Sequence, residues 1–218
     1  MGPFATLYRS SVGKKFVMGL TGLFLCSFLV VHLSGNFLLF KHDGGVAFDA
    51  YGSFMSTNLL IRTMEIVLFA GFLLHLVTGT TTWLKNRGAR PEKYVRNDAS
   101  ANSTWMSRTM FLTGSIVFIF LVIHLRTFWV PARFFHESNP SMYQLVRAAF
   151  SSPVYSGFYI VAIALLAFHL RHGFQSAFQT FGIKNQKYVP LIHLAGAVFW
   201  LLIPLGFISM PVYFLMNP

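Results

Sequence analysis

Five apolar stretches, each long enough to cross a lipid bilayer as a helix of about 20 residues, decide what this chain can fold into. They lie at residues 16–40, 63–84, 110–130, 154–177 and 191–216. Unpaired backbone groups are costly in lipid, so such stretches cross the bilayer as helices. We therefore predict an all-α membrane protein with five transmembrane helices, built as a single domain over residues 1–218.

The composition supports this prediction. Hydrophobic residues make up 55% of the 218 residues, and phenylalanine alone occurs 25 times. A soluble domain of this size could not bury so much apolar surface. The formal net charge of +11 does not indicate nucleic-acid binding, because the basic residues lie in the segments between the apolar stretches. The first stretch is too long for the apolar region of a signal peptide, so we expect a retained helix.

The distribution of basic residues predicts the orientation in the membrane. Twelve of the 17 lysines and arginines lie in the first, third and fifth segments between the stretches, and five lie on the other side. By the positive-inside rule, the N-terminus is expected in the cytoplasm and the C-terminus outside. A short interfacial helix is expected within residues 41–62, and an amphipathic helix lying on the surface near residues 142–149. Pro204, Gly206 and Pro211 are expected to kink the fifth helix or end it early.

One histidine occurs in each of the first four apolar stretches: His32, His75, His124 and His169. Ionisable residues inside a membrane are rare and usually functional. His32 follows Lys15 by 17 residues and His124 follows Arg108 by 16, so both are expected about 25 Å along helices that rise from the cytoplasm. His75 and His169 lie in descending helices and are expected in the inner half. The histidines therefore form an outer and an inner pair by depth.

Two imidazoles facing each other in a helical bundle are typical axial ligands of a bis-histidine haem b. The sequence thus predicts two haems b, held by the first four helices and carrying electrons across the bilayer. The one cysteine, Cys26, offers no C-x-x-C-H attachment for c-type haem. Hydrogen bonds between helices are the plain alternative for the histidines. A metal-ion transporter is another, although Glu65 is the only acid expected at membrane depth.

Several residues near the predicted haems are candidates for further contacts. Gly71 and Gly79 flank His75 on one helix face, where they either form a flat groove or pack helices closely. Residues expected at the haem propionates or the haem edge are Arg108, Arg171 and His172. His193 is open between a propionate contact, a quinone contact and a simple interfacial position.

The motifs around these residues are FLVVHLSGN, MEIVLFAGFLLHLVTG, NRGARPEKY, SRTMFLTGSIVFIFLVIHL and FHLRHGFQSAFQTFG. Taken together, they resemble the five-helix, dihaem cytochrome b558-type anchor subunit of succinate dehydrogenases and fumarate reductases, over nearly the whole chain. The resemblance implies that His32, His75, His124 and His169 are the haem ligands. Some relatives have an acid two positions before the fourth ligand, where this chain has Ala167. A proton route that depends on that acid does not carry over.

The resemblance also implies partners and a membrane. A flavoprotein with FAD and an iron–sulfur subunit would dock on the cytoplasmic side of a bacterial inner membrane, and quinone, usually menaquinone, would be the substrate. We expect the partners at residues 85–108 and 181–187. No dicarboxylate chemistry is expected on this chain, because it lacks clustered acids, nucleophiles and a nucleotide-binding glycine loop.

For the quinone, the sequence leaves two sites open. The outer site would lie beside His32 and His124, with hydrogen-bonding or proton-exchanging groups from Asp49, Tyr51, Asn58 and Glu65. The inner site would lie near His193 and Arg171. Two other classes of protein also stay open: a haem b subunit of a nitrate reductase or hydrogenase, which would lack a co-purifying succinate-oxidising flavoprotein, and a transporter without haem, which would show no pigment spectrum.

Overall fold

The computed structural model describes residues 10–89, 105–134, 141–183 and 185–217, and within these ranges all regular structure is helical. Three short helices, α3 (Val46–Thr57), α6 (Trp105–Arg108) and α9 (Met142–Phe150), accompany five long helical columns. The columns are α2 (Ser11–Asn36) with η1 (Phe37–Phe40); α4 (Leu59–Gly88); α7 (Met110–His124) with η2 (Leu125–Trp129) and α8 (Val130–Phe134); α10 (Pro153–Thr180); and α11 (Val189–Ala197) with η3 (Val198–Leu202) and α12 (Ile203–Met216).

Each column is long and apolar enough to cross a membrane, which confirms the prediction of an all-α membrane protein with five transmembrane helices. The helices are longer than the apolar stretches because polar caps set where they begin. Ser10 accepts a hydrogen bond from the Gly13 amide at 2.9 Å. Asn58 accepts hydrogen bonds from the amides of Leu60 and Ile61 at the start of α4. Such caps satisfy amides that the first helical turn leaves free.

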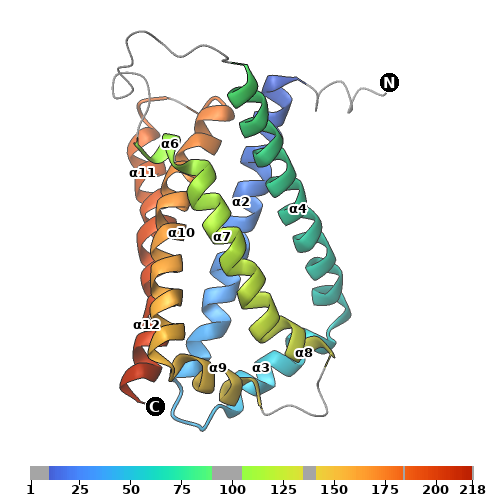
Figure 1. Ribbon diagram of the computed structural model, residues 1–218, viewed down its shortest axis with the longest axis vertical. Helices are drawn as coiled ribbons and strands as arrows, with labels where there is room; N and C mark the ends of the chain where they lie inside the picture. Colours follow the sequence, from blue (N-terminus) through green and yellow to red (C-terminus); the bar gives the residue numbers. More distant parts are fainter. Residues whose placement is uncertain (1–9, 90–104, 135–140, 184, 218) are drawn as a thin grey trace.

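The columns form a bundle in which α2 lies between α4 and α10, α7 crosses in front of α2, and α11 and α12 run along α10 (Figure 1). We call the end where α2 begins and α4 stops the N-end; α6 lies there as well. We call the opposite end, with α3, α8, α9 and the C-terminus, the C-end. The described residues include three side-chain carboxylates, and each belongs to an element of the C-end: Asp43 bonds to the amides that begin α3, Asp49 lies in α3, and Glu65 bonds to Trp129 just before α8.

The C-end is closed by the two short helices that the sequence predicted. Helix α9 is not merely a surface helix, because Val146 and Phe150 are only 5% and 6% exposed and belong to the main apolar core. Helices α3 and α9 are joined by Asp49, whose carboxylate accepts a hydrogen bond from the Tyr143 amide at 2.9 Å. Gly45, at φ 95°, lies so close to the Tyr143 ring that a Cβ atom would approach it to 2.3 Å. α9 is therefore fixed in place.

The prolines were expected to kink the fifth helix or to end it early, and the column does not end early. It continues to Met216, with Pro204 in the first turn of α12 and Pro211 buried inside that helix. The π-helical turn η3 precedes Pro204. A wider turn accommodates the backbone where proline removes a hydrogen bond, and transmembrane helices tolerate proline when neighbouring groups compensate.

Candidate functional site

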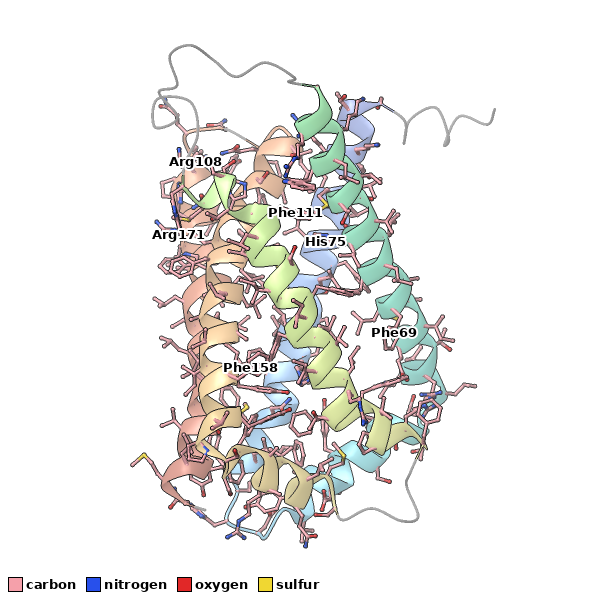
Figure 2. The ribbon with its side chains drawn as sticks, in the orientation of Figure 1. Phe69, His75, Arg108, Phe111, Phe158 and Arg171 are labelled. Carbon is pink, nitrogen blue, oxygen red and sulfur yellow. The ribbon has the colours of Figure 1, made fainter. Side chains whose placement is uncertain are left out.

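The four histidines face each other in two pairs inside the bundle. The imidazole centres of His32 (α2) and His124 (α7) are 5.7 Å apart, with their planes at 88°. Those of His75 (α4) and His169 (α10) are 6.4 Å apart, with their planes at 67°. We call these the C-end pair and the N-end pair; His75 is labelled in Figure 2. The structure thus brings together the same partners that depth along the helices predicted.

The separation of the rings in each pair suits one metal atom between them. A metal–imidazole bond of about 2 Å on each side, with about 1 Å from nitrogen to ring centre, gives about 6 Å between ring centres. Among the described residues, no three histidine, cysteine or acidic side chains gather as a metal site. Each pair therefore offers two imidazoles to one metal, which is the number of protein ligands that a bis-histidine haem takes.

Thr21 holds the imidazole of His75. Its Oγ1 lies 3.1 Å from Nδ1 of His75, and the same hydroxyl donates its proton to the Val17 carbonyl at 2.8 Å. Because that proton is already used, Thr21 is an acceptor for Nδ1–H of His75. The remaining nitrogen, Nε2, then carries the lone pair that a metal needs, which is the usual arrangement around metal-binding histidines.

The C-end pair has polar partners as well. Nδ1 of His124 lies 3.2 Å from the hydroxyl of Tyr159. The Asn36 amide donates to the His32 carbonyl at 2.8 Å and lies 3.4 Å from Nδ1 of that residue. Sequence reasoning missed these partners. Of these partners, only Asn36 could have been predicted from the sequence. It follows His32 by four residues and so lies on the same helix face.

Nδ1 of His169 is buried without a hydrogen-bond partner among the described residues, which is unusual for a buried polar atom. Glycines also stand against both imidazoles of the N-end pair. A Cβ on Gly22 would lie 3.4 Å from the His75 ring, and one on Gly114 would lie 3.3 Å from the His169 ring. Because glycine has no side chain, the space beside these two rings stays open, and a flat ligand needs such space.

Both pairs line one cavity of about 2000 Å³ between α2, α4, α7 and α10. Cavities for a single small ligand usually measure about 300–1,000 Å³. The volume, together with two separate pairs of imidazoles, suits two large flat groups rather than one. The residues present therefore fit two haems.

The cavity reaches polar groups at the C-end, including the predicted quinone candidates Asp49, Tyr51 and Glu65. Glu65 accepts a hydrogen bond from Nε1 of Trp129 at 2.6 Å and forms an ion pair with Arg62. Asn58 is not among the lining residues, because its side chain caps α4.

Tyr51 lies against the α2 backbone at the C-end of the cavity. A Cβ on Gly35 would fall 2.3 Å from its ring, so glycine is required there. Partial burial raises the pKa of the Tyr51 hydroxyl. The phenol therefore remains protonated and can donate a hydrogen bond at physiological pH.

The N-end of the cavity is lined by basic and polar groups, among them Lys15, Asn86, Arg108 and His172. Arg108 and His172 thus line the cavity, as contacts with a haem edge would require. Arg171 does not, because its guanidinium sits over the Trp200 ring at 4.9 Å, on the side facing the fifth column. His193 also lies outside the cavity lining, with its Nδ1 3.3 Å from the Gln175 amide. A helical periodicity of 3.6 residues separates neighbours such as Arg171 and His172 onto different faces.

Gly71 and Gly79 both face α2. A Cβ on Gly71 would meet the Phe24 ring at 2.9 Å, and one on Gly79 would meet the Met18 side chain at 3.1 Å. Gly79 also lines the cavity, whereas Gly71 does not. Close packing of α4 on α2 therefore accounts for Gly71, and Gly79 serves both packing and the cavity wall.

Comparison with known proteins identified a protein of similar sequence. The chain is 29% identical over 174 residues to the succinate dehydrogenase cytochrome b558 subunit of Bacillus subtilis (strain 168), covering 76% of this chain and 80% of the relative. No family model matches the chain, and no solved structure matches it. The match confirms the resemblance to the cytochrome b558 subunits of succinate dehydrogenase that the motifs indicated.

Proposed function

We propose that this chain, a relative of the succinate dehydrogenase cytochrome b558 subunit, is the dihaem membrane anchor of a succinate:quinone oxidoreductase. In this role it passes electrons between an iron–sulfur subunit and membrane quinone. One observation carries the proposal: a single cavity contains two facing pairs of imidazoles. The ring centres within the two pairs are 5.7 and 6.4 Å apart. Bound haem would supply reversible one-electron transfer.

The protein's own residues would bind and orient the two haems. His32 and His124 would hold one, and His75 and His169 the other. A haem held by two imidazoles would supply electron transfer rather than oxygen chemistry. Thr21 and Tyr159 would fix the orientation of their imidazoles. Lys15, Arg108 and His172 at the N-end of the cavity would pair with haem propionates.

We place the iron–sulfur and flavin partners at the N-end, which the basic-residue distribution assigns to the cytoplasm. The expected docking segments are residues 85–108 and 181–187; of these, residues 90–104 and residue 184 lie outside the described part of the chain. The N-end pair would then receive electrons first, and the C-end pair would pass them to quinone.

For the quinone site we favour the C-end, because Asp49, Tyr51 and Glu65 share the cavity with His32 and His124. The Tyr51 phenol would donate a hydrogen bond to a quinone carbonyl, and the Glu65 carboxylate would exchange a proton. The competing N-end site has no such support, since Arg171 and His193 lie outside the cavity lining. Menaquinone is the expected quinone.

The proposal is tested by purifying the chain with its partners and counting haem. We expect two haems b per chain by pyridine haemochrome assay, a co-purifying flavoprotein, and succinate–quinone or quinol–fumarate activity. One haem or none per chain would contradict the dihaem assignment. A haem-containing complex without succinate or fumarate activity would point to a different respiratory enzyme.

The hydroxyl of Thr21 provides a further prediction. Thr21→Val keeps the shape of the side chain but leaves Nδ1–H of His75 without its acceptor, in a segment where a lost hydrogen bond costs about 1 kcal/mol. We expect the N-end haem alone to change its reduction potential, measured by redox titration of its absorbance. Thr21→Ser, which retains the hydroxyl, should behave as the natural protein; equal shifts in both variants would argue against the hydrogen bond.

A further inference from the structure

A line of three hydroxyl groups leads away from His124. Its Nδ1 lies 3.2 Å from the Tyr159 hydroxyl, which lies 3.1 Å from the Tyr155 hydroxyl. Tyr155 also donates to Oγ1 of Thr127 at 2.9 Å. Tyr159 is only 3% exposed, so water does not compete for its hydroxyl.

The π-helical turn η2, which begins directly after His124, supplies the far end of this line. A π-helical turn holds more residues than an α-helical one, so it changes the direction of the side chains that follow, and such turns are frequent at functional sites. In η2, Thr127 meets Tyr155 on α10, while Trp129 faces Glu65 on α4. The same irregular turn thus serves both the imidazole partner and the proposed quinone site.

The Tyr159 ring is fixed by its surroundings. It packs edge-on against Phe120 and Phe150, with ring centres 4.9 and 5.0 Å apart. The buried hydroxyl of Ser156 donates to the Phe150 carbonyl at 2.7 Å and so fastens the start of α10 to the end of α9. Because the ring has little freedom to move, the position of its hydroxyl beside His124 is set by packing.

Counting protons fixes the direction of the hydrogen bonds once His124 binds a metal through Nε2. Nδ1 then carries a hydrogen and must donate to Tyr159. Hydroxyl protons can rotate, so Tyr159 would then donate to Tyr155, opposite to the Tyr155-to-Tyr159 direction seen in the structure, and Tyr155 would give its one proton to Thr127. The reverse direction would bring the Tyr159 proton to Nδ1 and leave the hydrogen of the imidazole on Nε2, which excludes metal binding. Hydrogen bonds that run in one direction along a chain polarise and strengthen one another.

We infer that Tyr159 is a positioning residue that fixes His124 with Nε2 towards the cavity and, with Tyr155 and Thr127, lowers the reduction potential of the C-end haem. This inference rests on the proposed function. An imidazole that donates its N–H to an acceptor becomes a more basic ligand, and a more basic ligand stabilises oxidised iron over reduced iron. Among the described residues, the N-end pair has no matching line of hydroxyl groups, since the Thr21 hydroxyl donates its proton to a backbone carbonyl.

The test is a redox titration of haem absorbance in the whole purified complex, with the C-end component identified as the one that His32→Ala removes. We expect Tyr159→Phe to raise the potential of the C-end haem and leave the N-end haem unchanged. A change of about three- to tenfold in the oxidised-to-reduced ratio at fixed potential is expected, and tenfold corresponds to 59 mV for one electron. Tyr155→Phe and Thr127→Val should shift it in the same direction by less.

Tyr213→Phe is the matched control, because this ring packs on Phe40 of η1 and lies outside the hydroxyl line; it should shift neither component. Unchanged potentials in Tyr159→Phe with both haems present would overturn the inference, as would an equal shift in the control. If Tyr159→Phe loses the C-end haem, the other two variants decide: an upward shift supports the inference and no shift overturns it. A natural complex without haem would instead overturn the proposed function.

Discussion

Replacing either histidine of one pair by alanine is expected to remove one haem and leave the other. His32→Ala and His124→Ala should each lose the C-end haem, and His75→Ala and His169→Ala should each lose the N-end haem. The ring centres within each pair are close enough to share one iron, and an offset of several residues along a helix, at about 1.5 Å per residue, could not be bridged by bonds of about 2 Å. Low-temperature difference spectra of the four variants, with redox titration, measure the loss.

His193→Ala is the control for these variants. His193 is a histidine of the same chain whose imidazole bonds to Gln175 outside the cavity lining, so both haems should remain. The pairing is wrong if His32→Ala and His75→Ala lose the same spectral component while His124→Ala loses the other. Loss of the N-end haem is also expected to weaken assembly with the partner subunits, because that haem would lie nearest to them.

Glu65→Gln should lower quinone-linked turnover by about tenfold or more while both haems remain. The substitution keeps the size of the side chain and an oxygen that can accept from Trp129, but it removes the charge that pairs with Arg62 and the ability to exchange a proton. General acid–base groups commonly contribute 10²–10⁴-fold to rate. Turnover is measured with succinate or quinol as electron donor, and haem content by absorbance.

Asp43→Asn provides the matched control for the Glu65 variant. Asp43 is another acid at the C-end, but its carboxylate caps α3 by accepting from the Gly45 and Ala47 amides, and it does not line the cavity. Its replacement should leave turnover unchanged. If Glu65→Gln also leaves turnover unchanged while His193→Ala lowers it, the quinone binds at the N-end.

The sequence by itself determined the helices and the depth of the histidines. Length and hydrophobicity are enough to identify five membrane-spanning helices, because a bilayer admits few other structures. Distance along a helix follows from counting residues at about 1.5 Å each, so the charges that flank each stretch predicted the relative depths of the four histidines: His32, His75, His124 and His169. Depth alone then sorted them into the two pairs that the structure brings together.

Only the tertiary structure decided what surrounds each imidazole. Thr21 and His75 are 54 residues apart in sequence, and His124 and Tyr159 are 35 apart; no local pattern connects such residues. Inside an apolar helix, periodicity does not distinguish the face towards lipid from the face towards a neighbour, so the turning of Arg171 towards Trp200 could not be predicted. The π-helical turn η2, which directs Thr127 and Trp129 to different neighbours, depends on packing between helices, because rotation about a helix axis is set by contacts with the other helices.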